Sequence, residues 1–332
     1  MLVYAPTPGV HEPEDGARTG FSGPTEGARV RYNPRARLDS SQVSRRSGGG
    51  GMGGFPMGGG GSGMRVGGGI GGFIVLVVIF LLQSQLGGGG GTGVGSGQDA
   101  GGSLDQCTTG RAANQDQDCA LVADVNSIQS YWADALPRQS GTEYTRAVTN
   151  IFSGSVSTGC GTATADVGPF YCPVDNNVYL DTTFFEDMLE GRLGARGGEF
   201  SRAYVLAHEY GHHVQDLLGT MGRVRTQQGA TSDAVRLELQ ADCYAGMWTR
   251  HATTARDANG EVFILDLTQD DIARALDAAA AVGDDRIQRR SSGRVDPESW
   301  THGSAEQRQR WFMTGMKAGT LRACDTFSAN PL

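Results

Sequence analysis

The most apolar stretch of the chain lies between two tracts of glycine. Residues 66–86 read VGGGIGGFIVLVVIFLLQSQL, and no charged residue occurs from Val66 to Gln98. With its uncharged flanks the apolar run reaches about 20 residues, the length of a helix that crosses a bilayer. A buried core helix is a poorer interpretation because the glycine flanks leave it nothing to pack against. A cleaved signal peptide is disfavoured because no A-x-A-like site follows. The pattern predicts one transmembrane helix over 66–86.

Apolar residues recur with helical spacing through much of the chain after residue 104. Residues 119–136 are predicted to form a helix, because their apolar side chains are spaced three or four positions apart, as on one helix face. These side chains are Leu121, Val122, Val125, Ile128 and Trp132. Further helices are predicted over 181–194, 203–219, 232–251, 267–283 and 302–319.

Local signals mark the ends of several of these helices. Thr268 with Asp271, and Ser304 with Gln307, have the spacing of a capping box. Gly219 is expected to end the helix that begins near residue 203.

One segment has the pattern of strands rather than of a helix. Residues 168–181, GPFYCPVDNNVYLD, predict two short strands around a Pro-Val-Asp-Asn-Asn turn. Asp181 is expected to cap the helix that follows. The fold class expected for 104–332 is therefore α+β, mainly α, with one short sheet.

Composition separates the folded part from the rest. Most of the excess of glycine, 52 residues in all, lies between residues 47 and 102, and such runs behave as flexible linkers. We therefore expect a linker over 87–103. The first 65 residues have few apolar side chains and many Pro, Gly and Arg, which predicts a largely disordered segment. The formal net charge of -8 argues against a nucleic-acid partner, because phosphate binding needs basic clusters.

The charges around the predicted span indicate its orientation. Eight arginines precede the span, and no Lys or Arg follows it before Arg111. The positive-inside rule then predicts a single-pass protein of the cell membrane with residues 1–65 in the cytoplasm and residues 104–332 outside.

The cysteines point to an oxidising compartment. All six follow the predicted span, and an even number on that side suits disulfides. Their spacing suggests the pairs Cys107–Cys119, Cys160–Cys172 and Cys243–Cys324. Free buried thiols are the alternative, and a cysteine zinc site is disfavoured because no C-x-x-C occurs.

The helix predicted over 203–219 carries three of the six histidines. His208, Glu209 and His212 form H-E-x-x-H. Positions four apart lie one turn apart on one face of a helix, so both imidazoles can bind one metal ion. The glutamate between them lies to one side, where it can take a proton from water at the metal. The alternative is a partly exposed polar face on a core-packed helix, although unpaired polar groups in a buried helix are costly.

A catalytic zinc needs a third protein ligand. In ELQADCYAGMW, Glu238 and Asp242 lie four residues apart on one helix face. We expect Glu238 to be the third ligand. Asp242 is expected to accept a hydrogen bond from a ligating histidine and so orient it. The reverse assignment, with Asp242 as the ligand, stays open.

Three further side chains are candidates for a place in or near the site. His213 follows a predicted ligand on a different helix face and is interpreted as structural or exposed. His302 precedes a capped helix and can reach a cleft, where it would hold an oxyanion or substrate. The alternative for His302 is a structural hydrogen bond in a loop. Tyr244 is a second candidate for the oxyanion.

Several segments together resemble a known family. Four of them are similar to segments of the membrane-anchored neutral zinc metallopeptidases of bacteria, which are of the zincin type. The four segments are HEYGHHVQ, ELQADCYAGMW, FYCPVDNNVYLD and HGSAEQRQRWF. RYNPRARLDSSQVSRRSGGG is also similar to the start of that family. The resemblance implies Zn²⁺ held by His208, His212 and Glu238, with Glu209 as the base and a peptide or protein as substrate. By analogy with zincin architecture, residues 177–181 are expected to form the edge of the cleft.

Two rival functions remain at this stage. Two histidines and a carboxylate also describe the facial triad of iron oxygenases, but that chemistry does not need the glutamate of H-E-x-x-H. A membrane-tethered binding or scaffold module with a structural zinc is the other rival. Its zinc would have a fourth protein ligand and no open position.

Overall fold

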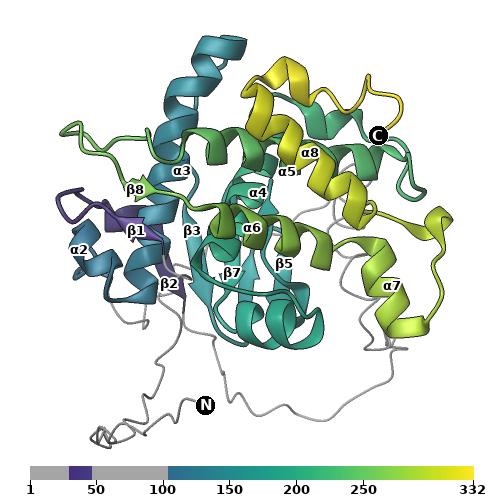
Figure 1. The fold of residues 1–332 in the computed structure, drawn as a ribbon, viewed down its shortest axis with the longest axis horizontal. Helices are drawn as coiled ribbons and strands as arrows, with labels where there is room; N and C mark the ends of the chain where they lie inside the picture. Colours follow the sequence, from purple (N-terminus) through teal and green to yellow (C-terminus); the bar gives the residue numbers. More distant parts are fainter. Residues whose placement is uncertain (1–29, 47–103) are drawn as a thin grey trace, which may run out of the picture.

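The computed structural model describes residues 30–46 and 104–332 (Figure 1). The helices in these residues are α2 (Gly110–Ala113), α3 (Gln117–Ser140), α4 (Glu199–Leu217), α5 (Asp233–His251), α6 (Gln269–Ala281), α7 (Asp284–Ser292) and α8 (Ala305–Ala318). A π-helix, η4, covers Phe184–Arg192, and short 3-10 turns include η1 (Ser40–Gln42), η5 (Thr220–Arg223), η6 (Pro297–Ser299) and η7 (Leu321–Cys324).

The strands form three small sheets. They are β1 (Arg31–Tyr32), β2 (Val43–Arg46), β3 (Thr149–Phe152), β4 (Ser155–Thr158), β5 (Gly161–Thr164), β6 (Phe170–Cys172), β7 (Asn177–Asp181) and β8 (Ile264–Asp266). The largest sheet has the order β2-β3-β7-β6, in which β2, β3 and β7 are parallel and β6 is antiparallel to β7. β1 pairs with β8, and β4 pairs with β5. The described residues have an α+β, mainly helical fold, as predicted, but they contain three sheets where one was expected.

Most of the predicted helices are confirmed, with their ends where the local signals placed them. Both capping boxes are present at the starts of α6 and α8. Gly219 adopts a left-handed conformation, with φ of 68°, two residues after the end of α4. Positive φ is accessible to glycine without the clash that a Cβ would create, so the chain can turn away there.

One helical prediction was wrong in detail, and one helix was not predicted. Asp181 is the last residue of β7, and the π-helix begins at Phe184. The Asp181 carboxylate instead accepts hydrogen bonds from the backbone and hydroxyl of Thr183. The helix predicted over 267–283 is followed by α7, which was not predicted because its sequence, DDRIQRRSS, has only one large apolar side chain.

Residues 30–46 are folded, which corrects the expectation of disorder for this part of the first 65 residues. β2 pairs with β3, and Tyr32 and Val43 lie in the hydrophobic core. The order of this segment comes from contacts with residues far along the chain, which composition alone does not reveal.

None of the helices in the two described ranges combines the length and hydrophobicity that crossing a membrane requires. The predicted span over 66–86 and the linker over 87–103 lie outside the described residues.

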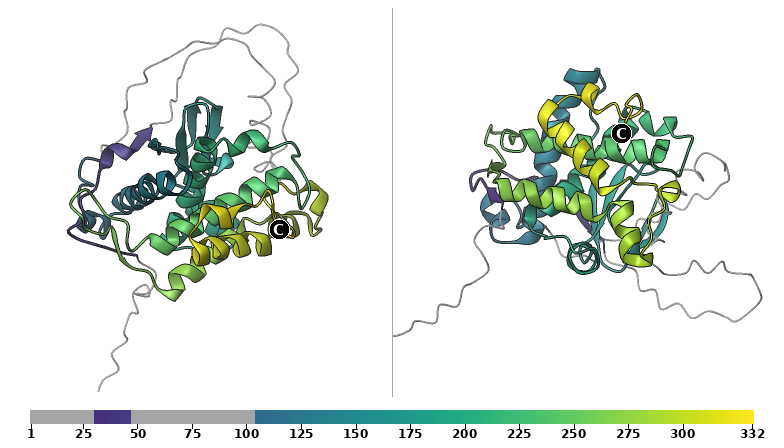
Figure 2. Two further views of the ribbon diagram at one scale, coloured as in Figure 1. Left: turned by 90° about the horizontal axis from the view of Figure 1, so that it is seen from above. Right: turned by 45° about the vertical axis from the view of Figure 1, so that its right-hand side comes forward.

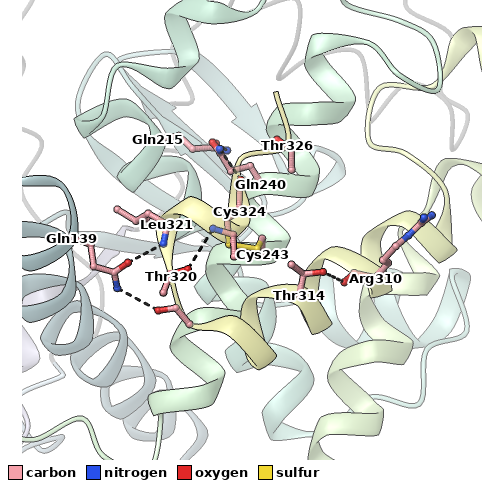
Figure 3. The surroundings of a disulfide bond; sticks show 12 residues. Gln139, Gln215, Gln240, Cys243, Arg310, Thr314, Thr320, Leu321, Cys324 and Thr326 are labelled. Atoms are coloured by element: carbon pink, nitrogen blue, oxygen red, sulfur yellow. Dashed lines mark hydrogen bonds between the residues drawn. A yellow bond between two sulfur atoms is a disulfide. The ribbon is translucent and has the colours of Figure 1, made fainter. Parts of the chain in front are cut away.

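The three predicted disulfides, Cys107–Cys119, Cys160–Cys172 and Cys243–Cys324, are all confirmed. The third joins α5 to η7 near the C-terminus, and Figure 3 shows its surroundings. Gln139 on α3 holds the same turn, because its Oε1 accepts a hydrogen bond from the Leu321 backbone and its Nε2 donates one to Gly319.

Helix α4 is central to the fold. It contacts α3, α5 and α6, together with strands β6 and β7. The Tyr210 and Thr149 hydroxyls share a hydrogen bond that links α4 to β3. On another side, Gly211 lies directly against Ala241 of α5. Helix α8, in yellow in Figure 2, runs along α5 in a close contact made by glycines on both helices.

Candidate metal centre and cleft

Two helices bring three metal-ligating side chains together. His208 and His212 lie one turn apart on α4, and Glu238 faces them from α5. The Nε2 of His208 lies 3.3 Å from Glu238 Oε2, and the Nε2 of His212 lies 3.5 Å from Glu238 Oε1. One donor atom from each residue falls within 4.8 Å of the others, and all three side chains are buried. This set of two imidazoles and a carboxylate is one that zinc binds in proteins.

His208 is oriented by a buried polar cluster. Its Nδ1 lies 2.9 Å from Asp242 Oδ1, and the Tyr204 hydroxyl donates to the same oxygen at 2.5 Å. Arg308 donates two hydrogen bonds to Asp242, from Nε to Oδ2 at 2.8 Å and from Nη2 to Oδ1 at 2.9 Å. A carboxylate held by arginine accepts hydrogen bonds and does not donate them, so in neutral His208 the proton lies on Nδ1, and Nε2 is the nitrogen that can bind a metal.

His212 is oriented by an amide. Its Nδ1 lies 2.9 Å from Gln215 Oε1. The Gln215 amide nitrogen donates to the backbone oxygen of Leu237 and to Gln240 Oε1, which identifies Oε1 of Gln215 as an acceptor. Gln240 in turn donates to the backbone oxygen of Cys324, beside the disulfide in Figure 3. The Nε2 of His212 is therefore also free to bind a metal.

The electrostatics of the cluster favour positive charge. Burial alone would lower the pKa of His208, but Asp242 and Glu238 raise it to about 9. Burial would raise the pKa of Asp242, but Arg308 and His208 lower it to about 2. Burial raises the pKa of Glu209, against the opposing effect of the two histidines. The carboxylates thus stabilise a cation at this point, which suits a bound metal ion.

The cluster lies in a cleft with a cavity of about 140 Å³. Glu209 and His302 line this cleft with the three candidate ligands. The Nε2 of His302 lies 3.9 Å from Glu238 Oε2. Its Nδ1 lies 2.8 Å from the Thr301 hydroxyl.

The position of His302 depends on a residue that sequence reasoning missed. Asp284, at the start of α7, is 2% exposed. Its Oδ2 accepts hydrogen bonds from the backbone nitrogens of Thr301, His302 and Gly303 at 2.7–3.0 Å. Arg308 was missed as well. In the sequence, Asp284 and Arg308 are simply charged residues near predicted core positions. Most such residues are exposed to solvent, so nothing distinguished these two.

Two other predictions about the site have different outcomes. Tyr244 is buried against Trp132 and does not line the cleft, so its proposed contact with an oxyanion was wrong. His213 is structural, as predicted: its ring nitrogens lie 3.1 Å from the Tyr171 hydroxyl and 2.6 Å from the Thr145 backbone oxygen.

The strand at the edge of the cleft also differs from the prediction. Residues 177–181 form β7, which is paired on both sides, by β3 and by β6. β6 lies at the edge of the sheet instead, and residues 167–169 immediately before it line the cleft.

The fold and the cluster define a helical protein with an H-E-x-x-H metal centre completed by a glutamate from the next helix. The chain belongs to the family described as "Putative neutral zinc metallopeptidase", whose model matches residues 32–327. An uncharacterized protein of Mycobacterium tuberculosis, Rv2575, is 52% identical over 234 residues, which cover 70% of this chain and 78% of that protein. The uncharacterized protein YpfJ of Escherichia coli is 38% identical over 305 residues, which cover 90% of this chain and 99% of YpfJ. No solved structure matches this chain.

Proposed function

We propose that this protein is a zinc-dependent peptidase. The observation that carries the proposal is the convergence of both histidine Nε2 atoms and the Glu238 carboxylate in a cleft that Glu209 also lines. His208, His212 and Glu238 would hold the zinc, with Asp242 orienting His208. When bound there, zinc would polarise the peptide carbonyl and make water a better nucleophile.

Glu209 is the general base in this proposal. It follows His208 on α4 and lines the cleft, so its carboxylate can take the proton of the attacking water and pass it to the leaving amine. Its burial favours this role, because a desolvated carboxylate is a stronger base than one in water.

His302 is proposed to stabilise the oxyanion. Asp284 holds the backbone of the loop that carries it, and the ring lies in the cleft. A hydrogen bond from this ring to the developing negative charge would stabilise the transition state more than the substrate.

The edge strand β6 is proposed to position the substrate. An extended peptide can pair with the free edge of a sheet, and in the described residues β6 has a partner on one side, β7. Because residues just before β6 line the cleft, a peptide paired there would pass over the metal centre.

A scaffold with a structural zinc is the second candidate, and the donor count favours the peptidase over it. Such a site needs four protein ligands. In the described residues the candidate donors group as three, His208, His212 and Glu238, which is one fewer than such a site needs.

The metal content of the full-length protein tests the proposal. We expect one zinc per chain in the parent, and its loss in His212→Ala. His251→Ala is the matched control, because His251 lies outside the cleft and should leave the zinc in place. The parent should also cleave members of a peptide library. A folded parent that binds no zinc would refute the proposal, and zinc without cleavage would favour the scaffold.

A further inference from the structure

We propose that the cleft selects peptides with a large apolar side chain beside the scissile bond. This inference rests on the proposed peptidase function. The apolar side chains that line the cavity include these six: Phe184, Met188, Leu193, Val205, Val282 and Ile287. They come from four separate places in the chain: the π-helix and the loop after it, α4, the end of α6, and α7.

The apolar part of the cavity lining, formed by these six side chains, begins next to Glu209, the proposed base. Val205 and Glu209 lie four residues apart on α4, and both line the cavity, so they share one face of the helix. A substrate whose scissile bond reaches Glu209 would therefore place a neighbouring side chain against Val205 and the wall around it.

The volume of the whole cleft, including the space beside the metal cluster, sets an upper limit on the side chain that it can hold. Its volume is about 140 Å³. An apolar cavity of about 150 Å³ in another protein admits benzene. The charged residues that line the cleft all belong to the metal cluster or contact it. An aspartate or lysine side chain entering the apolar part would lose its hydration without gaining a partner, which is costly.

A peptide library tests this specificity with the full-length enzyme. We expect one position beside the cleaved bond at which leucine or phenylalanine gives kcat/KM at least about 10-fold above alanine, with aspartate and lysine lower still. Met188→Lys should shift the preference at that position toward aspartate and glutamate. Val174→Lys introduces the same charge at an exposed site outside the cleft and should leave the profile unchanged.

The outcomes separate this inference from the proposed function. A parent that cleaves no peptide contradicts the function itself. A parent that cleaves with no apolar preference, or a Met188→Lys enzyme with the parental profile, overturns the specificity alone. If Met188→Lys does not fold, Met188→Ala serves instead. It should favour larger side chains, and an unchanged profile there would also overturn the inference.

A separate observation concerns residues 30–46, which we call the N-terminal segment. We infer that this segment and residues 104–332 fold as one unit in one compartment. The segment supplies Tyr32, Ala36, Leu38 and Val43 to the hydrophobic core. β2 also extends the main sheet by pairing along its whole length with β3.

The strongest support comes from buried polar side chains of α3. Asp124 accepts a hydrogen bond from the Tyr32 hydroxyl at 3.0 Å. Asn126 makes two hydrogen bonds with the backbone of Asp39, at 2.6 and 3.1 Å. Gln129, only 1% exposed, donates to Gln42. Without the segment these groups would lose buried partners, which proteins rarely tolerate.

This arrangement bears on the path of the chain. Two parts of one folded unit cannot lie on opposite sides of a membrane. Residues 46 and 104 must then lie on the same side of any membrane. The orientation expected from the arginine count, with the two parts on opposite sides, is replaced in this proposal. The three disulfides favour an oxidising compartment for both.

Cysteine labelling of the full-length protein in intact cells tests this inference. Arg35 and Lys317 are exposed and lie in the two parts. Arg35→Cys and Lys317→Cys should react alike with a membrane-impermeant maleimide, both before and after the membrane is opened. Labelling from opposite sides would overturn the inference.

The melting temperature gives an independent measurement. Val43→Asp places a charge in the shared core and should lower the melting temperature of the full-length protein by at least about 5 °C. Val174→Asp, at a 55% exposed position, is the matched control and should change it little. Equal melting temperatures for the two variants would show that the segment does not pack in the core, and would equally overturn the inference.

Discussion

Glu209→Gln should lower kcat for peptide hydrolysis by about 100- to 10,000-fold while leaving the zinc content at one per chain. The amide has nearly the shape of the carboxylate, so the cleft and the three candidate ligands keep their positions. It has no basic oxygen that can take a proton from water at neutral pH. The loss should therefore fall on kcat, with little change in KM.

Two measurements together give this result its meaning. Zinc content establishes that the metal centre survives, and the rate establishes that the base is missing. Glu306→Gln is the matched control, because Glu306 is exposed on α8 with 88% of its side-chain surface accessible. It should behave as the parent. Parental activity in Glu209→Gln would refute the proposed mechanism, and a loss of zinc in the same variant would assign Glu209 to the metal instead.

Gly315→Ala should have the largest effect on stability. A Cβ at Gly315 would lie 1.8 Å from the backbone oxygen of Cys243 on α5. Backbone atoms of a helix cannot turn aside as a flexible side chain can, so α5 and α8 would have to separate. We expect the free energy of unfolding to fall by at least about 3 kcal/mol, the upper part of the range for overpacking. Chemical denaturation of the full-length protein measures it.

The same substitution should weaken the metal centre. α8 carries Arg308, and α5 carries Asp242 and Glu238, so separating the two helices pulls apart the pair that orients His208. Gly222→Ala is the control, because a Cβ there has no neighbour within 4 Å and its backbone conformation is ordinary. A Gly315→Ala protein as stable as Gly222→Ala would show that the close approach of the helices is not required.

The features that could be predicted from the sequence share a physical basis in short-range geometry. H-E-x-x-H places His208 and His212 on one face because a helix repeats every 3.6 residues. Capping boxes and Gly219 mark helix ends because they satisfy or redirect the backbone within one turn. Two of the disulfides close loops of 12 residues, so sequence spacing alone brought their cysteines near each other.

The place of Glu238 beside the two histidines was also predictable. Helix α5 has the same apolar periodicity as α4, and Glu238 and Asp242 lie four residues apart on one of its faces. That prediction was possible because the apolar pattern of α5 identifies it as a helix from the sequence alone. By contrast, α7 has little apolar patterning, and Asp284 at its start was missed. Its carboxylate accepts hydrogen bonds from three backbone nitrogens that lie 17 to 19 residues further along the chain, and the sequence near Asp284 gives no sign of this contact.

By itself, the sequence determined the positions of most helices, the three candidate metal ligands and the disulfide pairs. Only the tertiary structure decided which strand borders the cleft, that Arg308 holds Asp242, that Tyr244 faces the core, and that residues 30–46 complete the sheet. Helical periodicity and capping depend on residues a few positions apart, so the local sequence shows them directly. Strand pairing, buried ion pairs and close helix contacts join residues separated by tens to hundreds of positions, and the free energy of the whole packed chain selects among them.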